Sequence, residues 1–151
     1  MVRGVAAIVA AAIFTAPVTA RPSSVARDYR HFGLFGAWAP DCSEAASPDN
    51  PHVSVSMEGH AVIEQNEFGA GFETNRYLIV AARRMSGGKL AIDALFQQGD
   101  TEPRRQLIIM HIDGKSRRTL FTGTADAPPL VKAGIAVALG KPTPVLVRCD
   151  R

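Results

Sequence analysis

Four histidines are the residues of this sequence that most readily act as acid, base or metal ligand near neutral pH. His60 and Glu64 fall on one face of an expected strand, and His111 and Asp113 do likewise. Pairs of this kind are expected by chance in a chain with four histidines, and no serine stands in a Gly-x-Ser-x-Gly turn. The sequence therefore predicts no catalytic residue, no metal site and no cofactor, and a protein that binds without turnover.

Three double arginines, at 83–84, 104–105 and 117–118, are the unusual charge feature. Each lies at the end of an expected strand, where neighbouring side chains point to opposite faces. If the strands stack side by side, Arg84, Arg104 and Arg117 form a basic rim that binds a phosphate or carboxylate through bidentate contacts. The alternative is that the arginines solubilise strand ends and pair with nearby carboxylates, namely Asp93, Asp100, Glu102 and Asp113.

A loop over residues 66–75 carries two phenylalanines, Phe68 and Phe72, beside Gly69 and Gly71. Glycines next to exposed aromatic rings are typical of a mobile flap over a ligand. The alternative is a loop whose two aromatic side chains pack into the core. With Trp38, the only tryptophan, these rings are the candidate contacts for an apolar ligand.

Cys42 and Cys149 are the only cysteines, and they flank almost the whole chain that follows a predicted leader. An even pair in an exported protein predicts one structural disulfide, with two buried thiols as the alternative. Neither cysteine belongs to a Cys-x-x-Cys pair, so a thiol oxidoreductase is not supported.

Residues 1–20 have the three parts of a secretory signal peptide: a basic start, an apolar core, and Val18-Thr19-Ala20 before the cleavage point. A membrane anchor, the alternative, needs about 20 apolar residues, and Pro17 with the arginines from Arg21 onward stops the run too early. We expect a periplasmic or secreted protein without stable membrane insertion after cleavage.

The remaining chain of about 130 residues is long enough for one domain. Residues 21–33 predict an N-terminal arm or a short helix, and residues 34–151 predict the folded domain. The full chain has 17 Lys and Arg against 14 Asp and Glu, and this balance is too even to indicate a nucleic-acid partner.

Alternating apolar and polar residues separated by turn signals predict an all-β protein, a single antiparallel meander. Closure into a barrel is favoured over an open sandwich, because a disulfide between the first and last strands joins the two edges. At this size the interior is either filled with side chains or holds one small ligand. About eight short strands are expected, at 35–42, 53–57, 60–65, 76–85, 90–97, 104–113, 116–122 and 145–149.

The tripeptide Gly36-Ala37-Trp38 on the first strand, with Arg148 on the last, resembles the Gly-x-Trp pattern of lipocalins and related small barrels. The resemblance implies that Trp38 closes one end of the barrel beneath the Arg148 guanidinium. A guanidinium stacks favourably on an indole face. The second motif and the C-terminal helix of that family are missing here.

The chain is also similar to small periplasmic inhibitors of secreted metalloproteases, in which an N-terminal arm enters the protease cleft. Residues 21–25 match that arm. As a whole the sequence most resembles small exported proteobacterial proteins without an assigned function, through Trp-x-x-Asp-Cys, Asn-Pro-His and a terminal cysteine.

Two kinds of function follow from these patterns. The first is a carrier of a small apolar or anionic ligand inside or at the mouth of the barrel. The second is a protein-binding module, such as a protease inhibitor, whose partner is an envelope protein held by the loops and the N-terminal arm.

Overall fold

The computed structural model describes residues 24–149, which form one short helix and eleven strands. The predicted leader at 1–20 and the first residues of the arm lie outside the described residues. The elements are α1 (Ser24–His31), β1 (Gly36–Ala39), β2 (His52–Glu58), β3 (Ala61–Glu67), β4 (Asn75–Met85), β5 (Lys89–Gln98), β6 (Arg104–Asp113), β7 (Ser116–Gly123), β8 (Val131–Lys132), β9 (Ile135–Ala136), β10 (Lys141–Pro142) and β11 (Val145–Cys149).

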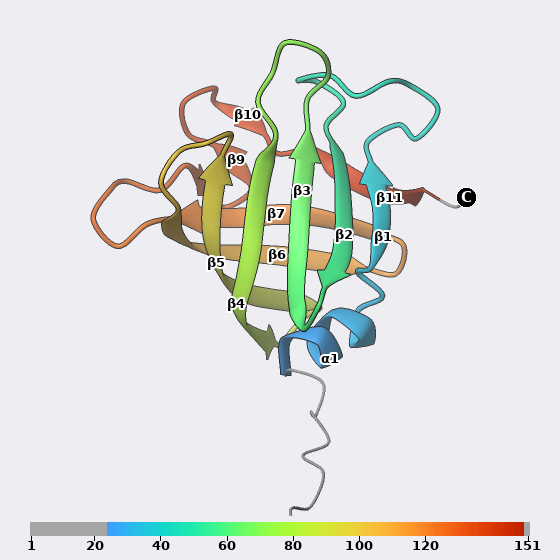
Figure 1. Cartoon of the computed structure of the whole chain (residues 1–151), viewed down its shortest axis with the longest axis vertical. Coiled ribbons are helices and arrows are strands. Elements are labelled where there is room, and N and C mark those ends of the chain that lie inside the picture. Colours follow the sequence, from blue (N-terminus) through green and yellow to red (C-terminus); the bar gives the residue numbers. More distant parts are fainter. Residues whose placement is uncertain (1–23, 150–151) are drawn as a thin grey trace, which may run out of the picture.

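Eight of these strands close into an antiparallel barrel, in the order β7-β11-β1-β2-β3-β4-β5-β6. A further pairing of β6 with β7 completes the ring, so these strands leave no open sheet edge between them. In Figure 1, β6 and β7 cross behind β2 to β5 at a large angle and form the opposite wall. The predicted closed barrel is confirmed, and the open sandwich is not formed.

The inward face of β5 shows why the sequence forms a barrel wall. Leu90, Ile92, Ala94 and Phe96 alternate along the strand and are all buried, as their spacing predicts. They belong to an interior that is closed on the opposite side by Met110 and other residues of β6. Burial of alternate apolar side chains is the main stabilising contribution to such a wall.

Two β-bulges interrupt the alternation. The register between β4 and β5 shifts between Ile79 and Ala81, and the register between β6 and β7 shifts between Ile109 and Met110. Each shift leaves one residue unpaired, Val80 on β4, which is 47% exposed, and Leu120 on β7. A bulge bends its strand and increases its twist, as the crossing of the two walls requires.

A disulfide joins Cys42, just after β1, to Cys149 at the end of β11, at a sequence separation of 107. Strands β1 and β11 pair directly, with Trp38 opposite Arg148. The predicted bridge between the two ends of the domain is therefore confirmed.

Helix α1 closes the lower end of the barrel in Figure 1. Val25, Ala26 and Tyr29 are buried among the strand residues of the core. The helix ends at His31 and is followed by Gly33, whose φ of 63° accompanies a bond from the Leu34 N–H to the Tyr29 carbonyl. Of the two predictions for this region, helix and arm, the structure shows a helix from Ser24.

The β8–β10 segment (residues 130–142) pairs with the C-terminal end of β7, where Thr122 lies opposite Val131. Arg118 fixes it to the barrel, since its guanidinium donates to the Gly134 carbonyl at 2.7 Å and to the Thr143 hydroxyl at 3.1 Å. The sequence predicted only an interrupted stretch here, because two-residue strands are too short to show alternation.

Candidate functional site

A buried ion pair lies at the bottom of the barrel interior. Glu64 on β3 and Arg117 on β7 are separated by 53 residues, and their side chains meet in two bonds, of 3.1 and 3.3 Å. Arg117 is 4% exposed and Glu64 is 8% exposed. A buried charge is tolerated when a partner and further hydrogen bonds compensate it, and this bidentate pair supplies both.

Two aromatic side chains complete this cluster from the closed end. The Tyr29 hydroxyl of α1 donates to Glu64 Oε1 at 2.9 Å. Burial, and next the charge of Glu64, raise the pKa of Tyr29 well above its usual value. The Arg117 guanidinium lies over the Trp38 ring, 5.2 Å from its centroid, and the indole N–H donates to the Leu34 carbonyl.

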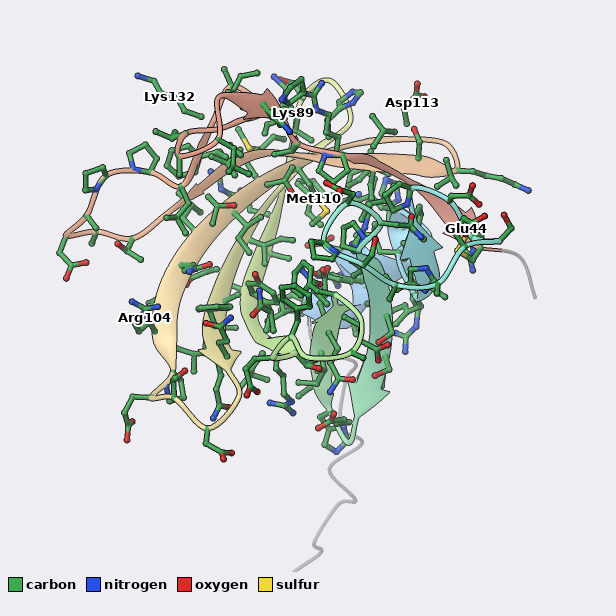
Figure 2. All side chains as sticks on the ribbon, turned by 90° about the horizontal axis from the view of Figure 1, so that it is seen from above. Glu44, Lys89, Arg104, Met110, Asp113 and Lys132 are labelled. Carbon is green, nitrogen blue, oxygen red and sulfur yellow. A yellow bond between two sulfur atoms is a disulfide. The ribbon has the colours of Figure 1, made fainter. Side chains whose placement is uncertain are left out.

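Above this cluster lies a cavity of about 290 Å³, at the lower end of the roughly 300–1,000 Å³ typical of small-molecule sites. It extends from the ion pair toward the upper end of the barrel, and Figure 2, seen from above, shows Met110 in the interior between the two walls. Its apolar lining includes Val53, Ile79, Ile92, Ile108, Met110 and Leu146, and its polar lining includes Glu64, Asn66, Tyr77, Arg117, Thr119 and Thr122.

One cavity-lining residue, Asn66, has an unpartnered polar atom, and its neighbour on the next strand has another. Asn66 Oδ1 is buried and has no hydrogen-bond partner among the described residues, and the same holds for Oδ1 of Asn75, its register partner on β4. Tyr77 lies on the same wall, and burial, followed by the charge of Glu64, raises its pKa to about 12. A buried acceptor without a donor costs about 1–3 kcal/mol, so this wall is suited to a ligand that brings a donor.

Two loops border the upper end of the cavity. Pro48 and Pro51 from the β1–β2 loop line it together with Phe68 from the β3–β4 loop. The loops touch, because a Cβ atom at Gly69 would lie 2.4 Å from the Ala46 carbonyl oxygen. Asn50 holds the first loop through bonds from its side-chain amide to three backbone carbonyls.

The two phenylalanines of the β3–β4 loop have different places. Phe68 lines the cavity and is half-buried, whereas Phe72 is 57% exposed. Phe68 therefore lies where it could contact a ligand, as predicted, whereas Phe72 faces solvent. Neither the fully open flap nor the loop with both rings in the core describes this arrangement.

The three arginines expected to form a rim do not come together. Arg84 lies 3.2 Å from Asp28 of α1, at the closed end. Arg104 lies over the Phe96 ring near the opposite end, and Arg117 is inside the barrel. These three side chains form no rim within residues 24–149, because Arg104 lies at the other end of the barrel, Arg84 faces α1, and Arg117 points inward to Glu64.

The alternative reading of the arginine pairs holds for one of them. Arg105 forms a bidentate ion pair with Asp93 on the outer side of the barrel. The hydrogen bond from Arg105 lowers the pKa of Asp93. This exposed pair contributes little to stability and serves mainly to solvate the strand.

The guanidinium against Trp38 comes from Arg117, where the lipocalin resemblance implied Arg148. Arg148 instead donates to the Gly33 carbonyl at 2.7 Å and lies beside Gly36, where a Cβ atom would be 3.6 Å from its Nη2. The indole is fully buried at the helix-covered end, so Trp38 does occupy a closing position. Its stacking partner belongs to β7 and not to β11.

The histidines remain apart from this cluster. His60 is exposed in the β2–β3 turn, whereas Glu64, its expected partner, points into the barrel and bonds Arg117 instead. Within residues 24–149, no group of three or more His, Cys, Asp or Glu side chains lies close enough to hold a metal ion.

Sequence reasoning missed three residues of this site, Tyr29, Asn66 and Tyr77, and considered Glu64 only as a partner of His60. One signal was present, since Glu64 and Asn66 continue the face of β3 on which Val62 is buried. A carboxylate on an inward-facing strand position needs a buried partner, and the sequence offered several arginines without indicating which.

Comparisons with known proteins add no relative to this picture. The lipocalin-like and inhibitor-like resemblances therefore remain predictions, and the function is argued from the cavity. No protein-family model matches this chain, and no curated protein or solved structure matches it either.

Proposed function

We propose that this protein binds and carries one small amphipathic molecule inside its barrel. The observation that carries the proposal is a cavity with apolar walls that ends on the buried Glu64–Arg117 pair and is lined by Asn66, whose buried amide oxygen has no partner. Ligand sites commonly combine an apolar lining with a few fixed polar groups. At roughly 30 Å³ per water, the cavity has the volume of about ten waters, which limits the ligand to a similar number of heavy atoms.

The polar end of the ligand is expected to be neutral and to carry a hydrogen-bond donor. Glu64 already compensates the charge of Arg117, so these two groups give the cavity no net charge. A carboxylate or phosphate entering here would be desolvated without a free cation to compensate it, which is costly. A hydroxyl or primary amide, by contrast, offers a donor to Asn66 Oδ1. Of the apolar and anionic ligands expected from sequence, the cavity favours the first kind.

The place of action that we propose is the periplasm or the extracellular medium. The disulfide between Cys42 and Cys149 supports an oxidising compartment, as does the expected leader. Among residues 24–149, no helix is long and apolar enough to cross a membrane.

A matched ligand series tests the proposal. Octanamide, 1-octanol and octanoate share one apolar chain and differ in the head, and each is titrated while Trp38 emission and the melting temperature are followed. Octanamide and octanol are expected to raise the melting temperature with concentration more than octanoate does, since native-state binding stabilises the fold. Trp38 responds because the stacked Arg117 also lines the cavity.

Two variants on one strand provide the control. Ile108→Phe fills part of the cavity and is expected to abolish the response, whereas Ile109→Phe, one position along on the other face of β6, keeps it. If no member of the series binds, and the chain instead inhibits a secreted protease only when residues 21–23, which precede α1, are present, the inhibitor alternative replaces the carrier.

A further inference from the structure

The β8–β10 segment presents an unusual group of exposed apolar side chains. Leu130, Val137 and Leu139 are 59%, 53% and 72% exposed, and Ile135 is also exposed. They lie within ten residues of one another in sequence, on strands and turns joined by backbone hydrogen bonds. Single exposed apolar residues are ordinary, but a contiguous group of this kind marks an interaction surface.

The strand register shows which way this surface points. Lys132 pairs with Ile135, which pairs with Pro142, so these three side chains lie on one face of the small sheet. Val131 belongs to the other face and lines the cavity, and Lys141 of the edge strand β10 lies on that second face, because both residues pair with Ala136. The face of the small sheet that carries Lys132 therefore points away from the barrel, and Figure 2 shows Lys132 projecting outward at the edge of the molecule.

The charges on this part of the chain have one sign. From residue 127 to residue 149 the sequence contains no Asp or Glu, whereas it contains Lys132, Lys141 and Arg148. Both lysines are exposed on the β8–β10 segment. An apolar surface with basic residues at its margin is complementary to an anionic bilayer, in which apolar side chains enter the interface and lysines meet the headgroups.

The segment is held in place before it meets any partner. Arg118 bonds both Gly134 and Thr143, and the Val137 N–H donates to the Leu130 carbonyl at 2.9 Å. The apolar side chains are thus presented on a fixed backbone, so docking carries a reduced ordering cost. A second copy of the chain is disfavoured as the occupant, because each copy would bring Lys132 to the contact without a carboxylate to pair with it.

We propose that the β8–β10 segment docks this protein on the surface of an anionic lipid bilayer, without insertion of a spanning element. This inference goes beyond the ligand-carrying function and does not depend on it. Because Val131 of the same segment lines the cavity, docking would bring the cavity close to the membrane.

Flotation with lipid vesicles tests the inference. The oxidised chain without its leader is mixed with vesicles of phosphatidylcholine alone or with one quarter phosphatidylglycerol. Binding is expected only with phosphatidylglycerol and is expected to fall as salt is raised, since exposed charges are screened. Lys132→Gln should weaken binding by about fivefold, whereas Lys141→Gln, on the other face of the small sheet, should weaken binding less. Leu139→Ser should weaken it without changing the salt dependence.

Matched controls come from other parts of the barrel. Lys89→Gln removes an exposed lysine from the β4–β5 hairpin, and Val80→Ser removes an exposed apolar side chain from β4. Both are expected to bind vesicles like the unchanged chain. Equal binding to both vesicle types, or equal losses in the controls, would overturn the inference. The inference would also be overturned if the unchanged chain does not bind vesicles and instead forms a dimer in sedimentation experiments, and Leu139→Ser dissociates that dimer. Failure here leaves the octanamide result unaffected, so the two proposals fail separately.

Discussion

Replacing Arg117 by methionine tests whether the pair with Glu64 is truly desolvated. Arg117→Met keeps an unbranched side chain against Trp38 but leaves the Glu64 carboxylate with Tyr29 as its remaining partner. Removing one member of a buried pair costs about 3–5 kcal/mol, because an uncompensated charge stays buried. Against a total of about 5–15 kcal/mol for a domain, this is a large fraction of the free energy of unfolding.

Two further variants separate the charge from the hydrogen bond. In Glu64→Leu combined with Arg117→Met no charge is buried, and the remaining defect is the Tyr29 hydroxyl without its acceptor, worth about 1–3 kcal/mol. Adding Tyr29→Phe removes that defect as well. The triple variant is therefore expected to match or exceed the stability of the unchanged protein, as apolar replacements of buried ion pairs often do.

Urea unfolding followed by far-ultraviolet circular dichroism measures these differences without relying on Trp38 emission, which Arg117 itself influences. With a slope of about 2 kcal/mol per M, the single variant should lower the midpoint by about 2 M. A loss below about 1 kcal/mol, as for an exposed ion pair, would refute the desolvated site. A triple variant as unstable as the single one would refute the assignment of the loss to an unpaired charge.

Three other outcomes are expected. Replacing both cysteines by alanine should lower the free energy of unfolding by a few kcal/mol, up to about 4.7 kcal/mol for a loop of this length. In the unchanged protein, Cys42 and Cys149 should resist alkylation until the disulfide is reduced. Both tyrosines have raised pKa values, so tyrosinate absorbance should appear at pH 10 in urea but only toward pH 12 in the native state. Between these pH values the native state holds more protons than the unfolded state. The contribution of the two tyrosines to the free energy of unfolding should therefore be fully present below pH 10 and should decline as the pH rises toward 12. Gly69→Ala should lower the melting temperature more than Gly71→Ala, since both positions have positive φ but only the first places a Cβ against the Ala46 carbonyl. Equal melting temperatures would mean that the two loops do not touch.

The barrel and its disulfide could be predicted because their signals are local or terminal. The inward face of β5 is visible as four apolar residues at every second position, and the two cysteines lie where the first and last strands are expected. A disulfide between terminal strands leaves few topologies other than closure. These predictions needed no knowledge of which distant residues meet.

The site could not be predicted because it depends on contacts between distant strands. Arg117 at a strand end looks like any solvated arginine until Glu64, 53 residues earlier, is known to face it. The bulges at Val80 and Leu120 also shift the alternation along β4 and β7, so inward positions cannot be counted from the strand ends. The Gly-x-Trp resemblance identified the right indole but assigned the wrong guanidinium, since both Arg117 and Arg148 lie on strands near it.

The seam formed by β11 has a consequence for local opening of the native state. This strand is five residues long, none of which is fully buried, and three residues pair with β7 and three with β1. Such a strand would open far more readily than the long β4–β5 ladder and would admit water to the charged cluster below. The disulfide at its end holds this short strand beside β1 and so opposes its local opening. In the oxidised protein, amide hydrogens of β11 should therefore exchange almost as slowly as those of the barrel core, and reduction should accelerate exchange there first.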